Sequence, residues 1–448
     1  MSELPPPITA IYSHEINQPI PLYQGVLEVD DGKKLLQRQG TIDLVWYPLP
    51  AVWFRLDLSE PSFLNSPAIK LSVPEHGVTT KATLRKVVTG DRLNYLAGNL
   101  EPYDIGTGDQ LSYIILHIVN FPAYIGTWIE NASCGWAGRL TLISEQQNWK
   151  LTIDTPYNCK DIQTNLDNQG GYAITNTAKL ERNNGEMFTA QQAEEIMIGL
   201  CYFLSFVAGR WVSPILPVGF DANNNKIWEK WFYFKLAPYQ NPKSNWFPSN
   251  ESFNLTPKYL GTPFRGFLKK YFDDNWQEPI KLLTYLYVES NNSGAEQAII
   301  TIQSAFELLF WLLFVEQLKC LSKESVEKLN ASDKLRLLFS HLQIPLQLPE
   351  PPEQYFIEEL TKLSKSENLP DCPACLTAVR NQIIHPKRKE ENTPILKYSN
   401  RTFFEATLLS LWYLELALLK IFDYQGTYAN RLRKNRHDTD YDRLPWAK

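Results

Sequence analysis

The chain has 448 residues, of which 44% are apolar, 13% aromatic and 21% charged, and this composition excludes an intrinsically disordered protein. Its 44 Lys and Arg residues are outnumbered by 49 Asp and Glu residues, so the net charge of −5 gives no overall attraction to nucleic acids or anionic membranes. The length predicts two or three domains.

Cysteine content and hydropathy favour a cytoplasmic protein. Six cysteines are too sparse for a disulfide scaffold in a chain of this length, which suits a reducing compartment. Residues 1–7 are Pro-rich and lack the basic and apolar regions of a secretory signal. The most apolar stretch, 299–315, contains Gln303 and Glu307 and has no uninterrupted run near the roughly 20 residues that span a bilayer. We therefore expect a buried helix there and no membrane contact.

The N-terminal part has the sequence pattern of β-strands. Between residues 21 and 154, apolar and polar residues alternate in short runs separated by Gly, Pro and Asn. The clearest runs are 40–46, 53–58 and 80–88, with a predicted hairpin of 139–143 and 149–153. We expect a β-rich domain over residues 1–185, folded as a sandwich or curled sheet.

Five tryptophans in this part admit two interpretations. They suit core or strand-pair positions, and they would also suit a ligand-binding β domain with an exposed aromatic groove. His117 lies inside the apolar run 113–119, where we expect a structural histidine with its hydrogen bonds satisfied.

The pattern changes near residue 185. Thr189 and Gln192 have the spacing of a capping box ahead of a predicted helix over 193–208. Residues 186–254 are predicted to be a mixed connecting region, with an Asn-rich turn and a small strand pair within 221–234.

Residues 255–448 are predicted to form an α-helical domain, so the whole chain is expected to be an α+β protein. The predicted helices are 264–272, 280–288, a helix of about 25 residues capped by Ser293, 334–342 capped by Ser332, 354–363, a helix from Asp371 to before Pro386, and a helix opened by Thr402 and Glu405, reaching 422 and stopped by Gly426.

The strongest chemical motif is Arg380-Asn381-x3-His385, at the end of a predicted helix. Asn381 and His385 are four residues apart and share a helix face, and the long Arg380 side chain can reach toward them. A histidine can transfer protons near neutral pH, and an arginine can stabilise the charge of a phosphorane. This set of residues suits metal-independent RNA cleavage.

Spacing alone is weak evidence, because the sequence contains it twice. Arg336 and His341 have the same separation within a leucine-rich helical segment, where we interpret them as surface or helix-end residues. The first motif differs because its arginine precedes an amide and its histidine precedes a helix-ending proline.

The motif in its helical context resembles the HEPN superfamily, over about residues 255–430. The β-rich half resembles, more loosely, the N-terminal domain of ApeA-type bacterial anti-phage proteins. The HEPN resemblance implies an endoribonuclease in which two protomers form one cleft, hence a homodimer through the helical domain. It implies that Arg380 contacts the phosphate, that His385 is the acid or base, that Asn381 supports them, and that Glu307 supplies a further polar group. The N-terminal half would recognise a trigger or a protein partner.

Two basic runs adjoin this domain. Lys387, Arg388 and Lys389 follow the motif and are predicted to bind RNA, and a second run begins at Arg431. No cofactor and no metal are expected. Cys372-Pro-Ala-Cys375 leaves open half a zinc site or a redox pair, but no second ligand pair follows at a suitable spacing, so we interpret it as part of a helix start.

The alternative to an enzyme is a non-catalytic nucleotide- or protein-binding adaptor that uses the same helical dimer. The segment could also have a purely structural role, in which it closes the helix, with Arg380 paired to an acid and His385 capping carbonyl groups.

Overall fold

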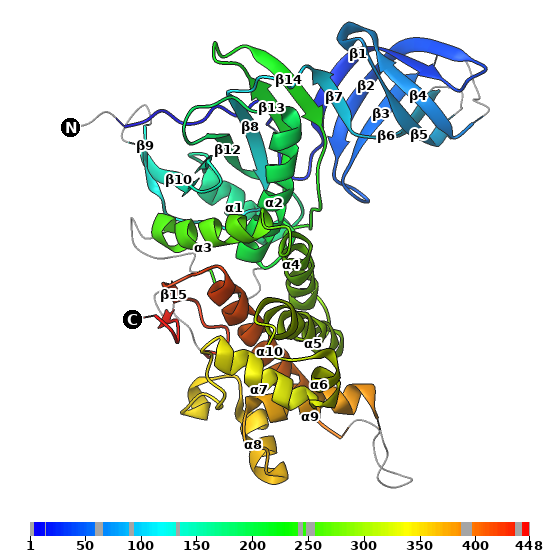
Figure 1. Ribbon diagram of the computed structural model, residues 1–448. Helices are drawn as coiled ribbons and strands as arrows, with labels where there is room; N and C mark the ends of the chain where they lie inside the picture. The colour runs from blue at the N-terminus through cyan, green and yellow to red at the C-terminus, as the bar shows by residue number, and fades with distance from the viewer. Residues whose placement is uncertain are drawn as a thin grey trace. The chain divides into compact units, whose positions relative to one another are not determined.

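The computed structural model describes residues 4–13, 15–58, 66–88, 94–130, 135–240, 245–247, 256–386, 397–434 and 441–447. The chain forms two compact units (Figure 1). The barrel–sheet unit contains residues 1–123, 127–201 and 212–242, and the helical unit contains residues 124–126, 202–211 and 243–448. The predicted α+β class, with a β-rich N-terminal part and a helical C-terminal part, is confirmed.

The first six strands close into an antiparallel barrel in the order β1-β2-β3-β6-β5-β4, with β4 returning to β1 (Figure 1). Their bounds are β1 Ile20–Asp30, β2 Leu35–Val45, β3 Ala51–Asp57, β4 Ala68–Val73, β5 Val78–Val88 and β6 Tyr95–Leu100, with a short 3-10 helix at Pro74–His76. Alternate residues point inward, so Phe54 and Leu56 are buried and Arg55 between them is exposed. The curled sheet that alternation predicts is thus fully closed.

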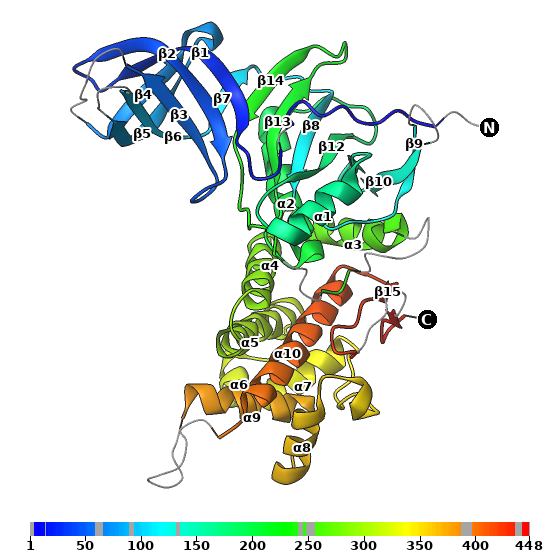
Figure 2. The ribbon, with the colours of Figure 1, turned by 180° about the vertical axis from the view of Figure 1, so that it is seen from behind.

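The remaining strands of this unit form an eight-stranded sheet in the order β7-β14-β13-β8-β12-β11-β10-β9, visible from behind in Figure 2. The strands are β7 Tyr103–Gly106, β8 Tyr113–Val119, β9 Thr127–Ile129, β10 Trp136–Ser144, β11 Trp149–Asp154, β12 Ile174–Arg182, β13 Pro214–Phe220 and β14 Lys226–Trp231. The predicted hairpin is β10–β11. The strand pair predicted within 221–234 is right only for β14, because its partner β13 precedes the Asn-rich turn. Helix α1 spans Cys159–Gln169 between β11 and β12.

His117 holds the N-terminal segment against this sheet. Its Nε2 atom accepts backbone N–H groups of Ile11 at 3.1 Å and Tyr12 at 3.0 Å, and its ring contacts the Tyr12 ring edge-on. His117 therefore has the predicted structural role through its Nε2 atom.

The five tryptophans of the N-terminal part include both core residues and one exposed residue. Trp46 and Trp149 are core residues, Trp53 and Trp136 are half-buried, and Trp128 on the edge strand β9 is 46% exposed.

Helix α2, Ala190–Ala208, begins with the predicted capping box. The Thr189 N–H donates to the Gln192 side chain at 3.0 Å, and the Gln192 N–H donates to the Thr189 hydroxyl at 3.2 Å. The first part of α2 belongs to the barrel–sheet unit, where Glu194 pairs with Lys230 of β14 at 2.7 Å, and its last turns belong to the helical unit.

The helical unit is a bundle around α10. Its elements are α3 Thr256–Tyr271, α4 Gln277–Asn291, α5 Ala295–Trp311 with a π-helical turn at Leu312–Gln317, α6 Lys323–Lys328, α7 Ala331–His341, a 3-10 turn at Pro352–Gln354, α8 Glu358–Glu367, α9 Cys372–Ile384, α10 Asn400–Ile421, and the short pair β15 Thr427–Tyr428 and β16 Asp442–Arg443. Tyr413 of α10 stacks on Phe339 of α7 with ring centroids 4.0 Å apart, and its hydroxyl donates to the Pro345 carbonyl at 2.7 Å. Gly266 allows α3 to approach the end of α10, because a Cβ there would lie 2.0 Å from the Phe422 carbonyl oxygen.

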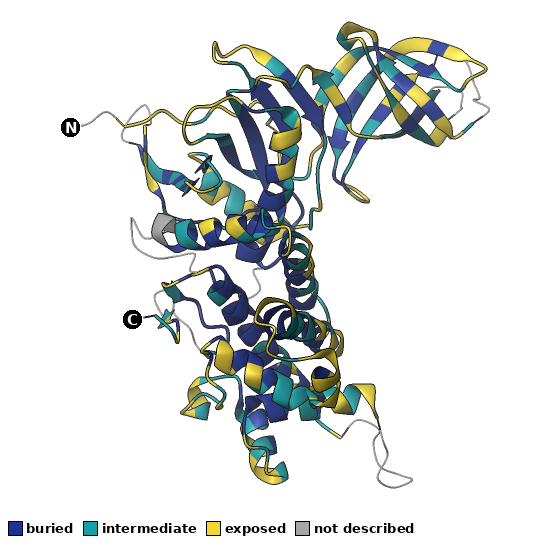
Figure 3. Cartoon of the chain, viewed as in Figure 1, coloured by how far each residue is buried: buried dark blue, intermediate teal, exposed yellow. Residues whose placement is uncertain are grey.

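In the part of the chain that the structure describes, two helices are long and apolar enough to cross a membrane, Ala295–Gln317 and Asn400–Ile421. Within the described residues, 61% and 83% of their most apolar windows are buried in the bundle, as Figure 3 shows for α10. The predicted buried helix at 299–315 is confirmed, and this burial is typical of core helices in a soluble domain.

The N-cap residues of α5 and α7 differ from those that the sequence predicted. Gly294 caps α5 without a side-chain bond, and the Ser293 hydroxyl instead donates to the Ser290 carbonyl. Asn330 caps α7, because its side chain accepts the Asp333 N–H at 2.9 Å. Ser332, the predicted cap, lies inside the helix.

Helix α10 ends at Ile421 with Phe422 as its C-cap, as predicted, but the capping residues at its two ends differ from prediction. Ser399 is the N-cap and accepts the Thr402 N–H, so Thr402 is a first-turn residue. Glu405 is fully buried and caps α8 instead, where it accepts backbone N–H groups of Glu359 and Leu360. At the C-terminal end the left-handed residue is Asp423, with φ of 56°, and not Gly426.

Candidate functional site

Helix α9 carries the motif, and its two ends form as the sequence predicts. The Asp371 carboxylate accepts the Ala374 N–H at 2.9 Å and so caps the first turn. The last helical residue is Ile384, and His385 follows with φ of −124° and ψ of 60°. Pro386 excludes a helical conformation at the residue before it, so the helix stops at the histidine.

The motif lies at this C-terminal end. The Arg380 side chain is half-buried, and its Nη1 donates to the Asn381 Oδ1 at 2.9 Å. The Arg380 Nε is buried and has no hydrogen-bond partner among the described residues. His385 is exposed, and its N–H donates to the Asn381 carbonyl at 2.8 Å. The structure therefore brings Arg380 and Asn381 into contact and leaves the imidazole open to solvent.

Glu307 does not join this group. It lies on α5, which contacts α9, but its carboxylate accepts Lys334 Nζ of α7 at 2.9 Å and Gln303 Nε2 at 3.2 Å. Among the described residues, no hydrogen bond links Glu307 to Arg380, Asn381 or His385. The predicted RNA-binding residues Lys387, Arg388 and Lys389 lie outside the described residues.

In its described part, the second basic run forms ion pairs within the fold. Arg431 is fully buried, and Arg433 and Lys434 form ion pairs. Their carboxylate partners are Glu415 for Arg431, Asp442 for Arg433 and Glu358 for Lys434. The charge of the buried Arg431 is therefore compensated within the fold, and those of Arg433 and Lys434 are partly neutralised by their carboxylate partners.

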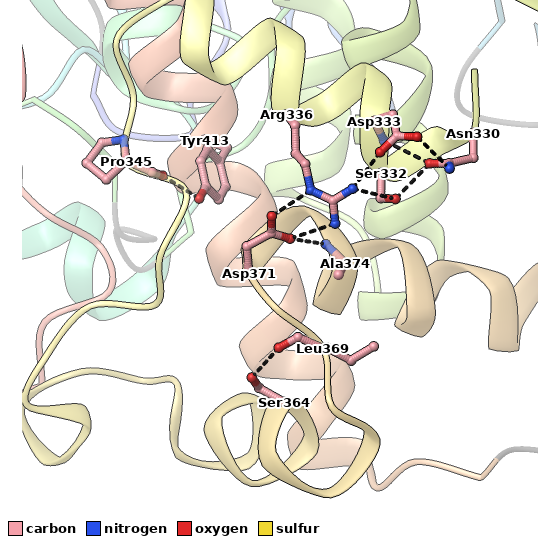
Figure 4. Close-up of polar contacts among 10 residues, drawn as sticks. All are labelled: Asn330, Ser332, Asp333, Arg336, Pro345, Ser364, Leu369, Asp371, Ala374 and Tyr413. Atoms are coloured by element: carbon pink, nitrogen blue, oxygen red, sulfur yellow. Dashed lines mark hydrogen bonds and ion pairs between the residues drawn. The ribbon is translucent and has the colours of Figure 1, made fainter. Parts of the chain in front are cut away.

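The second Arg-x4-His pair is predicted to be surface or helix-end residues, which is right for His341, whereas Arg336 is half-buried in an ion-pair network. Arg336 Nε donates to Asp371 at 2.6 Å and its Nη2 donates to the other carboxylate oxygen at 3.1 Å (Figure 4). Its Nη1 donates to Asp333 at 2.6 Å. His341 ends α7 and contacts the Phe314 ring edge-on. Arg336 thereby ties the start of α9 to α7.

The Cys372 and Cys375 thiols are buried at the first turn of α9. Burial raises the pKa of Cys372 to about 12 and that of Cys375 to about 11. Such thiols are poor nucleophiles and poor metal ligands. The described residues contain no cluster of His, Cys, Asp or Glu that could hold a metal ion. The interpretation of this pair as part of a helix start is supported.

A cavity of about 560 Å³ lies at the opposite end of α9 from His385. It is lined by the Pro-rich connector between α7 and α8, by α8, and by Pro370 and Asp371. Thirteen helical residues, about 20 Å of helix, separate Asp371 from His385. Sequence analysis treated the Pro-rich stretch only as a connector, and nothing in its pattern indicates a hollow. The cavity and the motif are thus separate features of one helix.

The chain is thus a two-unit α+β protein with a polar motif at the exposed end of a bundle helix. Two family models match it, the YopA central domain at residues 106–242 and the YopA C-terminal domain at residues 273–441. The first match ends where the barrel–sheet unit ends.

The chain is also similar to the SPbeta prophage-derived uncharacterized protein YopA of Bacillus subtilis (strain 168). The two are 26% identical over 452 residues, which cover 98% of this chain and 97% of that protein. No solved structure matches the chain.

Proposed function

We propose that this protein is a metal-independent endoribonuclease of the HEPN type. The observation that carries the proposal is the arrangement at the end of α9, where Asn381 holds the Arg380 guanidinium and His385 is exposed one turn away. A half-buried guanidinium and a solvent-accessible imidazole are two groups that suit cleavage of a phosphodiester in RNA.

In the proposed reaction the RNA 2′-hydroxyl attacks the adjacent phosphorus. His385 accepts the hydroxyl proton or protonates the departing 5′-oxygen, and Arg380 stabilises the negative charge of the phosphorane. The bond between phosphorus and the 5′-oxygen breaks, and the products are a 2′,3′-cyclic phosphate and a 5′-hydroxyl. Asn381 orients Arg380. Among the described residues Glu307 forms no hydrogen bond with the motif, and it has only an indirect, positioning role through its ion pair with Lys334.

One copy supplies one imidazole, whereas general acid–base cleavage uses both a base and an acid. A homodimer through the helical unit would place a second His385 across the cleft. Exposure of His385 in the single chain supports this arrangement, since the histidine is free to face a partner.

The similarity to a prophage-derived protein supports a role in the conflict between phages and bacteria. We place the enzyme in the cytoplasm, acting on RNA in anti-phage defence or growth arrest, with the barrel–sheet unit recognising a trigger or protein partner.

The test is incubation of purified full-length protein with RNA in excess EDTA. We expect cleavage by the wild type, a loss of about 100-fold or more for His385→Ala, and no comparable loss for His341→Ala, the matched variant in the second Arg-x4-His pair. Mass spectrometry should find 2′,3′-cyclic phosphate ends. Equal cleavage by the wild type and His385→Ala would remove the assignment.

A second candidate is a non-catalytic nucleotide- or protein-binding adaptor built on the same helical dimer. The pairing of Glu307 with Lys334 favours it, because the motif then lacks the additional polar partner that the resemblance implies. This function predicts a dimer in solution and no RNA cleavage by the wild-type protein.

A further inference from the structure

Charge is divided unequally around the barrel. The adjacent strands β3, β6, β5 and β4 carry five cationic side chains and one acidic side chain, Asp57. The neighbouring strands β1 and β2 carry one cation and three acids. All five cations of the first group are exposed: Arg55, Lys70, Lys81, Arg85 and Lys86. We call the outer surface of these four strands the cationic face.

A β-bulge increases the number of cations on this face. The register between β5 and β6 shifts between Leu84 and Lys86, so Arg85 and Lys86 are consecutive and both exposed. In regular alternation one of them would point into the barrel, where an unpaired charge is costly.

The cations are mostly not neutralised by the fold. Among the described residues, Arg55 is the one cation of this face with a carboxylate partner, Asp57 at 2.9 Å. Lys70 and Lys81 lie directly opposite each other on β4 and β5. Like charges at such positions are destabilising, and an anion bound between them would relieve the repulsion.

Aromatic side chains lie among these cations. Arg55 and Lys86 both pair in register with the small Ala97, and they extend over the ring of Tyr95, two residues away. The Arg55 guanidinium carbon is 4.5 Å and the Lys86 Nζ is 5.6 Å from the ring centroid. Tyr95 is half-buried, so part of the ring is accessible.

A second row of the same face repeats the combination. Trp53 of β3 pairs with Asn99 of β6, and the Asn99 Oδ1 accepts Arg85 Nε at 3.1 Å. Trp53 and Tyr95 are displaced by four residues along their paired strands, about 13 Å. This spacing lets the two aromatic side chains contact different bases of one extended strand.

We infer that the cationic face of the barrel binds single-stranded nucleic acid. Alternating basic and aromatic side chains on the outside of a small β-barrel provide phosphate attraction together with surfaces on which bases stack. Binding of an acidic protein or an anionic membrane would account for the charges but not for the two aromatic side chains among them. Double-stranded nucleic acid is also disfavoured, because its bases are already stacked on one another. The inference concerns the barrel alone and does not depend on RNA cleavage by the helical unit.

The experiment measures fluorescence anisotropy of the full-length protein with two labelled probes, dT12 and 2′-O-methyl U12. Neither probe has a free 2′-hydroxyl, so neither can be cleaved by the proposed mechanism. The test variants are Lys81→Glu/Lys86→Glu and Tyr95→Ala. The control is Lys33→Glu/Arg38→Glu, which changes the net charge equally on the β1–β2 side of the barrel. Thermal unfolding verifies that each variant is folded.

We expect the charge-reversal variant to raise Kd about tenfold or more, Tyr95→Ala about fivefold or more, and the control less than about twofold. Loss of two phosphate contacts should also reduce the slope of log K against log salt by about 1.4. Equal weakening by the test and control charge variants, or binding to phosphatidylserine vesicles with none to either probe, would overturn the inference. Absence of RNA cleavage with these binding results would overturn the proposed enzyme alone, and a preference between the probes would identify RNA or DNA.

Discussion

Arg431 and Glu415 form an ion pair in the core of the helical unit, with side chains 2% and 0% exposed. The Arg431 Nε donates to Glu415 at 2.9 Å, Nη1 donates to Asn291 at 3.1 Å, and the Tyr287 hydroxyl donates to the same carboxylate at 2.7 Å. Each charge is therefore compensated by a network that joins α4, α10 and the segment after α10.

Removing one partner of this pair should be severely destabilising. Arg431→Met leaves a buried, uncompensated carboxylate, and we expect the free energy of unfolding of the helical unit to fall by about 3–5 kcal/mol in guanidinium titrations. Arg433→Met is the matched control, because Arg433 is 33% exposed in its pair with Asp442 and should cost about 0–1 kcal/mol. Equal effects of the two substitutions would contradict this account. The double variant Arg431→Met/Glu415→Leu should recover much of the loss.

Asp371 has two roles that substitutions can separate. Its carboxylate caps α9 and forms the two-point pair with Arg336. Asp371→Asn keeps a good cap but loses the charge, whereas Asp371→Ala loses both, so we expect alanine to cost about 1 kcal/mol more than asparagine. The measurement is chemical denaturation of both variants beside the wild type. Identical stabilities for the two variants would show that the cap contributes nothing.

Glu229 makes the stability of the barrel–sheet unit depend on pH. Burial raises the pKa of this carboxyl to about 7, and the hydrogen bond from the Trp231 indole and the ion pair with Lys226 oppose the rise. Because the folded-state pKa is above the unfolded value, the stabilising contribution is complete below about pH 4.5 and is lost as pH rises through 7. The loss should reach at most about 3 kcal/mol.

The check is thermal unfolding from pH 4.5 to 8. Glu229→Gln should gain stability relative to the wild type across this window, whereas substitution of the exposed Glu101 by Gln should not. Parallel pH curves for the wild type and Glu229→Gln would refute the prediction.

The thiols should differ in reactivity by position. Cys372 and Cys375 are buried with raised pKa values, while Cys320 is exposed. In the native protein at pH 8 we expect iodoacetamide to modify Cys320 and leave the pair unmodified, and all three to react after denaturation. Peptide mass spectrometry gives the extents. Native labelling of Cys372 as fast as that of Cys320 would contradict the burial seen here.

Local features were predictable from sequence, and long-range partners were not. Thr189 with Gln192, Asp371 with the first turn of α9, and the β10–β11 hairpin depend on residues close in the chain, and all three form as predicted. Barrel closure depends on β4 returning to β1, about 40 residues away, which alternation does not encode.

The predictions that failed are those that depend on residues far apart in the chain. Arg431 looked like part of a basic surface run because its partner Glu415 lies in an apolar helix, and Glu405 looked like a local cap because the N-terminus of α8 is 45 residues away. In the motif, the contact of Arg380 with the adjacent Asn381 is local and foreseeable. The pairing of Glu307 with Lys334 depends on how α5 packs against α7, so it was not foreseeable from the sequence.

The two units do not correspond to two segments of the gene. Residues 202–211 belong to the helical unit although 212–242 return to the barrel–sheet unit. The Gly209 carbonyl accepts the buried Asn291 side chain at 2.8 Å, and Trp211 Nε1 donates to Glu289 at 2.9 Å. Recombination at a single junction near residue 242 would separate α4 from these partners. One unit can therefore be exchanged intact only by paired crossovers. Without them, the two units are inherited together.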